Sequence, residues 1–470
     1  CGMYRAVING QDVAMPLAPG ITDYRKRVQY QTYDITALLR ENNTMEAFLA
    51  DGWYRGSCGA WGLRNQYGTE TKLLAQLEIL YENGEQQTIF SDGSWQWSDD
   101  GPVRFADNKD GEIVDARMCP SYKNHAKETS HPVTPVCSNN VPIAEGERFH
   151  GQMHTTPSGK KILDFKQNMA GYISFHINAK EGQKITLRFG ELLENGELTL
   201  KNIQCATKKR ATPLQKVEYT CKDGSNFYQT HFAIFGFQYV EIDTEIDVNA
   251  EDFTAIAVYS QMEETGFFSS SNELLNKFVE ATKWSTKSNS ADLPTDCPTR
   301  ERHGWLGDAQ IFCASACYLF DYIAFAEKFE NDICDAQHQN GNYPQIVPTG
   351  GVDFYMKVMD GSPGWSDAGV FIPYRLYKQY NDLDELREKY PSMRRFAEYK
   401  IKTIGKHYLT ALPTGAGWKA SRNIANYGQS YGEWAEPTDV KAFAISDFIC
   451  PHPEETTAYI VYMLHCMAEI

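Results

Sequence analysis

The hydrophobic pattern of this 470-residue chain changes once, near residue 266. Before that point, short runs alternate apolar and polar residues between Gly, Asn and Asp, which is typical of strands. After it, Leu274, Leu275, Phe278 and Ala281 recur at helical spacing behind Asn272, a suitable N-cap. The sequence therefore predicts β domains followed by a helical domain.

The β part divides into two predicted domains. Residues 1–120 are expected to form an N-terminal β-sandwich, in which residues 82–85 turn a hairpin after an alternating run at 73–81. Residues 121–145 are rich in Pro, Ser, Asn and Lys and are assigned as a connector. Residues 146–262 are expected to form a second, jelly-roll-like β-sandwich, whose core includes the aromatic run at 232–239.

Residues 266–470 show helical stretches around 309–338, 366–381, 392–404 and 454–470, separated by Gly- and Pro-rich loops that carry acids and Trp. Helices joined by such loops favour an α/α toroid of the six-hairpin type, with a sugar cleft at one end. The twelve helices of such a toroid need roughly 360 residues at ordinary helix and loop lengths, more than residues 266–470 provide. We therefore expect only the first half of the barrel, incomplete at the C-terminus.

Residues 292–310 combine charged side chains with Pro, Gly and Trp in a way that no regular element requires. Pro294 and Pro298 exclude a helix from the first half, and Gly304 and Gly307 favour an irregular second half. The segment lies between two helix-patterned stretches. It is therefore predicted to be a rigid loop that presents its acids at one place.

Three carboxylates in this loop, from Asp296, Glu301 and Asp308, accompany the indole of Trp305. A glycosidic bond needs a positioned proton donor, and the C–H face of a sugar stacks on an aromatic ring. The combination favours a sugar site. The alternative interpretation is a tight structural loop closed by an Arg–Glu ion pair.

Composition excludes several classes of partner. A formal net charge of −16 without basic runs argues against nucleic acid and anionic membranes, and favours neutral glycosides over polyanions. The chain contains no run of 18 apolar residues, so no membrane-spanning helix is predicted. The oligomeric state stays unpredicted.

Twelve Cys occur without a Cys-x-x-Cys pair, and His150 and His154 lie four apart around a Gly without a nearby general-base Glu. We therefore expect no metal and no cofactor. Cys residues without a disulfide pattern indicate reduced thiols, which favours a cytoplasmic protein. Because the chain begins inside a predicted strand, we expect its natural N-terminus upstream, and secretion stays open.

The chain resembles the bacterial α-L-rhamnosidases of glycoside hydrolase family 78. The resemblance spans three domains in order and rests on residues 8–10 (Ile-Asn-Gly), 17–24 (Leu-Ala-Pro-Gly-Ile-Thr-Asp-Tyr), 30–34 (Tyr-Gln-Thr-Tyr-Asp), 52–56 (Gly-Trp-Tyr-Arg-Gly), 164–171 (Asp-Phe-Lys-Gln-Asn-Met-Ala-Gly), 236–239 (Gly-Phe-Gln-Tyr) and the loop at 296–310.

The resemblance implies hydrolysis of terminal, non-reducing α-L-rhamnose with inversion at the anomeric carbon, and hence a rhamnosylated small molecule or oligosaccharide as the partner. It implies that Glu301 is the general acid and that Arg300 orients a carboxylate. Asp296 and Asp308 would hold the rhamnose hydroxyls, and Trp305 would form a wall of the site.

Inversion needs a second carboxylate, about 6.5–9.5 Å from the acid, to activate water. The resemblance places this general base downstream, beyond Ile470; the candidates within the chain are Glu433, Glu436 and Asp367. Trp365 and Trp434 are predicted to line the cleft and stack on sugar, with Asp367 beside Trp365. The alternative places both Trp between helices.

Two other functions stay open. One is a non-catalytic rhamnoside- or glycan-binding protein, or a truncated inactive homologue, because two β-sandwiches and half a cleft can bind without turnover. The other is a glycosidase for a different sugar, since fold does not determine specificity. Release of rhamnose distinguishes these possibilities.

Overall fold

The computed structural model describes residues 1–206, 211–350, 360–405 and 453–470. The chain forms two compact units. The β unit contains Cys1–Ser138, Pro142–Gln261 and Cys297–Glu301, and the helical unit contains Asn139–Val141, Met262–Asp296 and Arg302–Ile470. Among the described residues, no helix has both the length and the apolar character needed to cross a bilayer.

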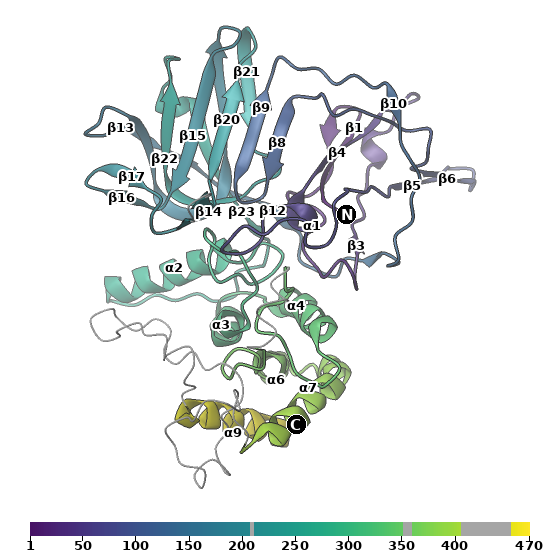
Figure 1. The fold of residues 1–470 in the computed structure, drawn as a ribbon, viewed down its shortest axis with the longest axis vertical. Coiled ribbons are helices and arrows are strands. Elements are labelled where there is room, and N and C mark those ends of the chain that lie inside the picture. Colours follow the sequence, from purple (N-terminus) through teal and green to yellow (C-terminus); the bar gives the residue numbers. More distant parts are fainter. Residues whose placement is uncertain (207–210, 351–359, 406–452) are drawn as a thin grey trace. The chain divides into compact units, whose positions relative to one another are not determined.

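The first part of the β unit consists of small sheets (Figure 1). Strand β1 (Met3–Ile8) lies between β2 (Gln11–Asp12) and β4 (Met45–Ala50). The predicted hairpin is confirmed, because β5 (Gln76–Leu80) pairs antiparallel with β6 (Gln86–Phe90). The other short elements are β3 (Gln29–Tyr30) with β11 (Val136–Cys137), β7 (Gln96–Trp97) with β10 (Asn124–His125), η1 (Thr36–Leu38) and α1 (Gly52–Arg55).

A ten-stranded sheet forms the rest of the β unit, in the order β12-β23-β14-β22-β15-β20-β9-β8, with β13 and β21 also paired to β14. Its strands are β8 (Val103–Asp107), β9 (Gly111–Asp115), β12 (Ile143–His150), β13 (Gln152–Thr155), β14 (Lys161–Ala179), β15 (Lys184–Gly190), β20 (Lys216–Thr220), β21 (Gly224–Gln229), β22 (Phe235–Thr244) and β23 (Phe253–Ser260). Shorter elements are β16 (Leu192–Glu194), β17 (Glu197–Thr199), β18 (Cys205–Ala206), β19 (Ala211–Thr212) and η2 (Ala250–Asp252).

Aromatic side chains fill the core of this sheet. Phe189 stacks on Phe235 with ring centroids 4.1 Å apart, and Phe165 meets Phe237 edge to face at 5.9 Å. Phe235 and Phe237 are completely buried, so the aromatic run belongs to the core as expected. The predicted boundary at residue 120 does not separate two sheets, because β9 pairs in parallel with β20 and extends the larger sheet.

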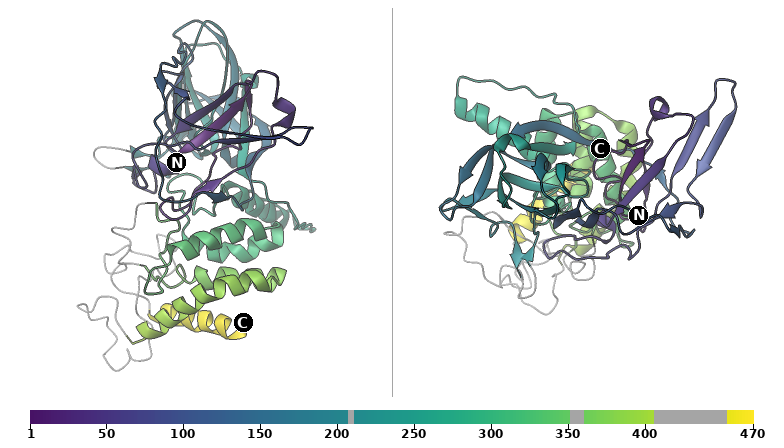
Figure 2. Two further views of the ribbon diagram at one scale, coloured as in Figure 1. Left: turned by 90° about the vertical axis from the view of Figure 1, so that its right-hand side faces the viewer. Right: turned by 90° about the horizontal axis from the view of Figure 1, so that it is seen from above.

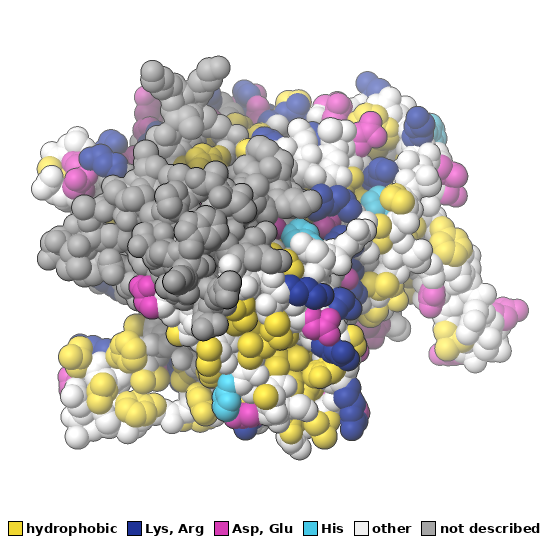
Figure 3. All heavy atoms as spheres, turned by 60° about the horizontal axis from the view of Figure 1, so that its bottom comes forward, with side chains coloured by type: hydrophobic (Ala, Val, Ile, Leu, Met, Phe, Trp, Pro, Cys, Tyr) yellow, Lys and Arg dark blue, Asp and Glu magenta, His cyan; other side chains and the backbone are white. Residues whose placement is uncertain are grey.

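The described helices of the helical unit are α2 (Glu273–Ser288), α3 (Leu306–Leu319), α4 (Ile323–Ala336), α6 (Ala368–Tyr380), α7 (Leu383–Thr403) and α9 (Pro453–Glu469). They lie in successive layers with roughly parallel axes (Figure 2). Helix α6 packs against α3, α4, α7 and α9. Apolar side chains gather on the face turned toward the reader in Figure 3. Val461 and Tyr462 of α9 are exposed.

Local sequence accounts for most of these helix limits. The Asn272 side chain accepts hydrogen bonds from the amides of Leu274 and Leu275 and so begins α2 as expected. Helix α7 begins at Leu383, earlier than the predicted 392, because Asp382 caps it in the same way. The helical stretch expected around 309–338 consists of two helices, because Phe320 is extended and forms a β-bridge with Glu264.

Candidate active site

The predicted loop at 292–310 begins with an ion cluster in the helical unit. Asp292 adopts a left-handed backbone conformation, with φ of 73°. Its carboxylate accepts hydrogen bonds from Lys328 Nζ at 2.9 Å and Asn140 Nδ2 at 2.8 Å. Lys328 also pairs with Asp332 at 3.0 Å, and all three charged side chains are buried. These contacts hold the first residue of the loop in an otherwise unfavourable conformation.

The Asp332 carboxyl in this cluster should make stability depend on pH. Burial raises the pKa of Asp332 from 3.8 to about 7, although Lys328 opposes the shift. Between about pH 4 and pH 7 the unfolded chain therefore loses this proton before the folded protein does, so the contribution of Asp332 to the free energy of unfolding falls as pH rises. Asp332→Asn is expected to flatten that fall, measured by urea denaturation at several pH values.

The exposed Asp384 of α7 offers a control for this prediction, because Asp384→Asn makes the same change of charge outside the core. The Asp384→Asn protein should keep the wild-type pH profile. An Asp332→Asn profile that matches the wild type between pH 4 and pH 7 would contradict the assignment.

Two hydrogen bonds between Asp296 and His303 join the two ends of the middle part of the loop. The Asp296 carboxylate accepts a hydrogen bond from the His303 amide at 2.9 Å, and the Asp296 amide donates to the His303 carbonyl at 3.0 Å. Arg302 and His303 are buried. One predicted sugar ligand, Asp296, thus also joins the ends of the segment that carries Glu301.

The segment Cys297–Glu301 belongs to the β unit, where a buried lysine positions it. Lys109 Nζ donates to the Arg300 carbonyl at 2.6 Å and to the Gly59 carbonyl. Thr299 packs directly on Gly236, where a Cβ atom would come within 2.4 Å of the Thr299 methyl. Gly236, the first residue of the Gly-Phe-Gln-Tyr motif, is therefore required, because a side chain at this position would collide with Thr299.

Glu301 lies at the end of this segment with its side chain 17% exposed. Arg300 Nη2 is 3.4 Å from Glu301 Oε1, and the Arg300 side chain is 44% exposed. The Glu301 amide also donates to the Cys297 Sγ at 3.3 Å. The Glu301 carboxyl group is thus mostly buried but reachable from solvent, with the Arg300 guanidinium beside it.

Trp305 and Asp308 lie at the N-terminal end of α3 in the helical unit, so the predicted irregular loop ends at Trp305 and the expectation for 306–310 is wrong, because these residues, Gly307 included, are helical. Trp305 is the N-cap residue, is half-buried and forms a β-bridge with Ile346. Asp308, in the first turn, is exposed and favourably placed for the helix dipole. Both side chains are thus accessible in the described part of the protein.

Trp365 meets the same end of α3. A Cβ atom added at Gly307 would lie 2.5 Å from the indole Cε2, so Trp365 lies directly against the residue that precedes Asp308. The helical unit therefore brings Trp365 to the helix end that carries Trp305 and Asp308. Trp434, Glu433 and Glu436 lie outside the described residues.

Asp367 differs from the other candidates because its side chain is fully buried. Its Oδ2 accepts a hydrogen bond from the Gly364 amide at 2.7 Å, and burial raises the pKa of its carboxyl. This geometry gives Asp367 a role in shaping the turn that carries Trp365. Direct contact with a sugar, or service as a base, stays a prediction.

Sequence reasoning missed the three lysines that hold these loops: Lys109, Lys328 and Lys400. Each is buried and contacts a loop distant in the sequence. The described residues contain no cluster of three or more His, Cys, Asp or Glu side chains suited to a metal. His150 and His154 are exposed and lie on strands.

Three family models match the chain in sequence order. The model of the α-L-rhamnosidase N-terminal domain matches residues 1–152, and that of the bacterial α-L-rhamnosidase concanavalin-like domain matches residues 154–259. The bacterial α-L-rhamnosidase 6 hairpin glycosidase domain matches residues 263–470. The chain belongs to the bacterial α-L-rhamnosidase family. The predicted order of two β domains and a six-hairpin domain is confirmed.

Relatives extend these matches over nearly the whole chain. The α-L-rhamnosidase of Streptomyces avermitilis is 32% identical over 457 residues, covering 93% of this chain and 41% of that protein. An α-L-rhamnosidase of Alteromonas sp. is 30% identical over 95% of this chain and 49% of its own length. The chain therefore spans about half the length of the curated relatives it matches.

A solved structure agrees with this assignment. The crystal structure of the Streptomyces avermitilis α-L-rhamnosidase complexed with L-rhamnose has a TM-score of 0.86 and 30% identity, and covers 100% of this chain and 43% of that one.

Proposed function

We propose that this member of the α-L-rhamnosidase family hydrolyses terminal, non-reducing α-L-rhamnosyl residues from glycosides with inversion. The geometry within each unit supports the proposal most directly: in the β unit Glu301 is partly accessible beside Arg300, and in the helical unit Trp305 and Asp308 are accessible at the start of α3. The relative that was solved with L-rhamnose makes this sugar the first to test.

In this proposal Glu301 protonates the leaving glycosidic oxygen. Arg300, 3.4 Å away, orients the carboxyl group. Trp305 and Trp365 offer apolar faces to the sugar ring, and Asp296 and Asp308 offer acceptors to its hydroxyls. Trp434 keeps its predicted role as a further sugar-stacking residue, outside the described residues.

The water-activating base is proposed to lie beyond Ile470. Asp367 is a poor candidate within the chain, because its buried carboxylate already accepts the Gly364 amide. Glu433 and Glu436 remain for mutagenesis, since the described residues do not include them.

The test is hydrolysis of p-nitrophenyl α-L-rhamnopyranoside by this chain and by the natural full-length protein, with NMR detection of the first-formed anomer. Release of β-L-rhamnose is expected, since inversion converts the α-glycoside into the β-sugar. The α-anomer as first product would overturn the inverting mechanism. Binding of the rhamnoside without release by either protein would favour the glycan-binding alternative, and cleavage of p-nitrophenyl β-D-glucopyranoside instead would indicate another sugar.

A further inference from the structure

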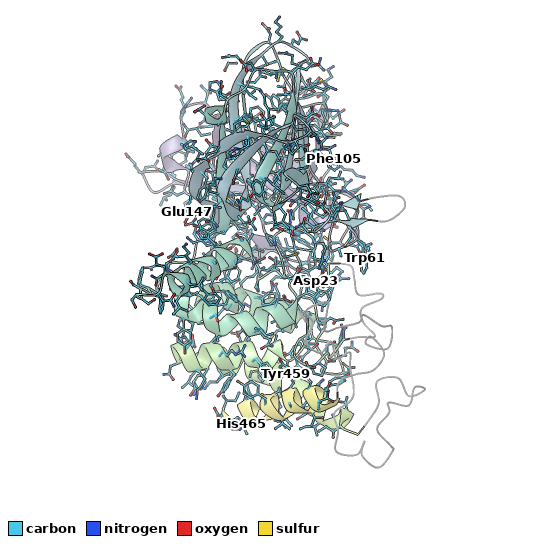
Figure 4. The ribbon with its side chains drawn as sticks, turned by 90° about the vertical axis from the view of Figure 1, so that its left-hand side faces the viewer. Asp23, Trp61, Phe105, Glu147, Tyr459 and His465 are labelled. Atoms are coloured by element: carbon cyan, nitrogen blue, oxygen red, sulfur yellow. The ribbon has the colours of Figure 1, made fainter. Side chains whose placement is uncertain are left out.

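The segment Asp360–Asp367 carries Trp365 and is fastened by side chains from several elements of the helical unit. His338 Nε2 forms a hydrogen bond with Asp360 Oδ2 at 2.7 Å. Gln310 of α3 donates through Nε2 to the Gly364 carbonyl at 3.0 Å. Tyr459 of α9, labelled in Figure 4, packs on Gly364, with 3.2 Å between its ring and a Cβ position there. The position of Trp365 is therefore set by its neighbours.

A buried lysine completes this set of contacts. Lys400 of α7 is completely buried, and its Nζ donates to the Gly361 carbonyl at 2.7 Å. Burial lowers the pKa of Lys400, and the charge of Asp367 opposes that shift. Because an isolated buried charge is unfavourable, Asp367 is its natural counter-charge. Lys400 thus holds the segment from α7 at Gly361, and Asp367 closes the turn within the segment at Gly364.

Another buried lysine of the same helix provides a comparison. Lys389 pairs with Glu385 at 2.9 Å and Glu388 at 2.7 Å, so its carboxylates come from its own helix. Lys400 also lies over the Phe396 ring of its own helix, at 5.8 Å, but the carbonyl that it donates to and the charge of Asp367 lie on the segment that carries Trp365. Lys400 therefore connects α7 to this segment, whereas Lys389 connects α7 to Asn331 of α4, at 2.7 Å, and has its counter-charges on its own helix.

We propose that Lys400 is a positioning residue, which, with Asp367, holds the segment Asp360–Asp367 so that Trp365 lies against Gly307 at the start of α3. Its consequence for sugar binding rests on the proposed function, because Trp365 is taken there as a wall of the rhamnose site. Lys400 itself, completely buried, acts through the segment and not by contact with substrate.

The test uses protein labelled with 5-fluorotryptophan and ¹⁹F NMR, in which the Trp365 signal is the one lost in Trp365→Phe. In Lys400→Met, without sugar, we expect this signal to shift or broaden, because the Gly361 carbonyl loses its donor. Lys402→Met is the matched control, since Lys402 is exposed two residues further along α7, and should leave the signal unchanged. An unchanged Trp365 signal in Lys400→Met would overturn the proposal.

The double variant Lys400→Met/Asp367→Asn covers the case in which Lys400→Met does not fold, because it removes both buried charges. An Asn at 367 can still accept the Gly364 amide, but Gly361 still lacks its donor. The Trp365 signal is therefore expected to stay displaced in the double variant. A wild-type signal there would also overturn the proposal.

Titration of the same samples with L-rhamnose separates this inference from the proposed function. We expect roughly tenfold weaker binding by Lys400→Met, the effect of about 1.4 kcal/mol, and, in hydrolysis, a larger change in KM than in kcat. A displaced Trp365 signal with wild-type rhamnose affinity would overturn the link to the sugar site. If the wild-type natural full-length protein neither binds nor releases rhamnose, the proposed function fails, while the sugar-free spectra still decide whether Lys400 positions Trp365.

Discussion

The Lys328→Met protein is expected to lose about 3–5 kcal/mol of its free energy of unfolding at pH 7, the usual cost of removing one partner from a buried ion cluster. Lys328 bridges Asp292 at 2.9 Å and Asp332 at 3.0 Å, and all three side chains are buried. Met is similar in length but leaves two carboxylates without their cation. Urea denaturation measures the loss directly.

Two further variants make this prediction specific. Lys277→Met replaces an exposed lysine on α2 and should change the free energy of unfolding by less than about 0.5 kcal/mol. Lys328→Met/Asp332→Asn should recover part of the loss, because one buried carboxylate is removed with its cation. A loss below about 1 kcal/mol in Lys328→Met would show that the cluster contributes little to the fold.

Glu301→Gln is expected to lower kcat on natural rhamnosides by about 10²–10⁴-fold, the usual contribution of a general acid, while KM changes little. Gln has nearly the same size but cannot donate a proton to the leaving oxygen. The loss should be smaller on p-nitrophenyl rhamnoside, because p-nitrophenolate leaves without protonation. Steady-state kinetics of the natural full-length protein on both substrates measure the effect.

The exposed Glu251 provides a matched control for this variant, since Glu251→Gln makes the same chemical change far along the chain from the loop. Glu251→Gln should keep wild-type kinetics on both substrates. Wild-type turnover by Glu301→Gln on a natural rhamnoside would remove Glu301 from the mechanism. An equal loss on both substrates would show that Glu301 acts otherwise than by protonating the leaving group.

The sequence by itself predicted the features that depend on neighbours along the chain. The hairpin of β5 and β6, the cap of α2 by Asn272 and the buried aromatic run with Phe235 and Phe237 follow local rules of turns, caps and alternation. The change of period near residue 266 likewise separated strands from helices. The loop with Glu301 was recognised because its composition suits no regular element.

Only the tertiary structure decided how that loop is held and what some of its neighbours do. Lys109 meets the Arg300 carbonyl across 191 residues, Lys328 meets Asp292 across 36, and Lys400 meets Gly361 across 39. Asp367, predicted to face a sugar, is buried and accepts a backbone amide. From the sequence alone a lysine is expected to be exposed, because burying its charge is unfavourable. Only the tertiary packing shows that a carbonyl or carboxylate distant in the sequence offsets the cost of removing the ammonium group from water.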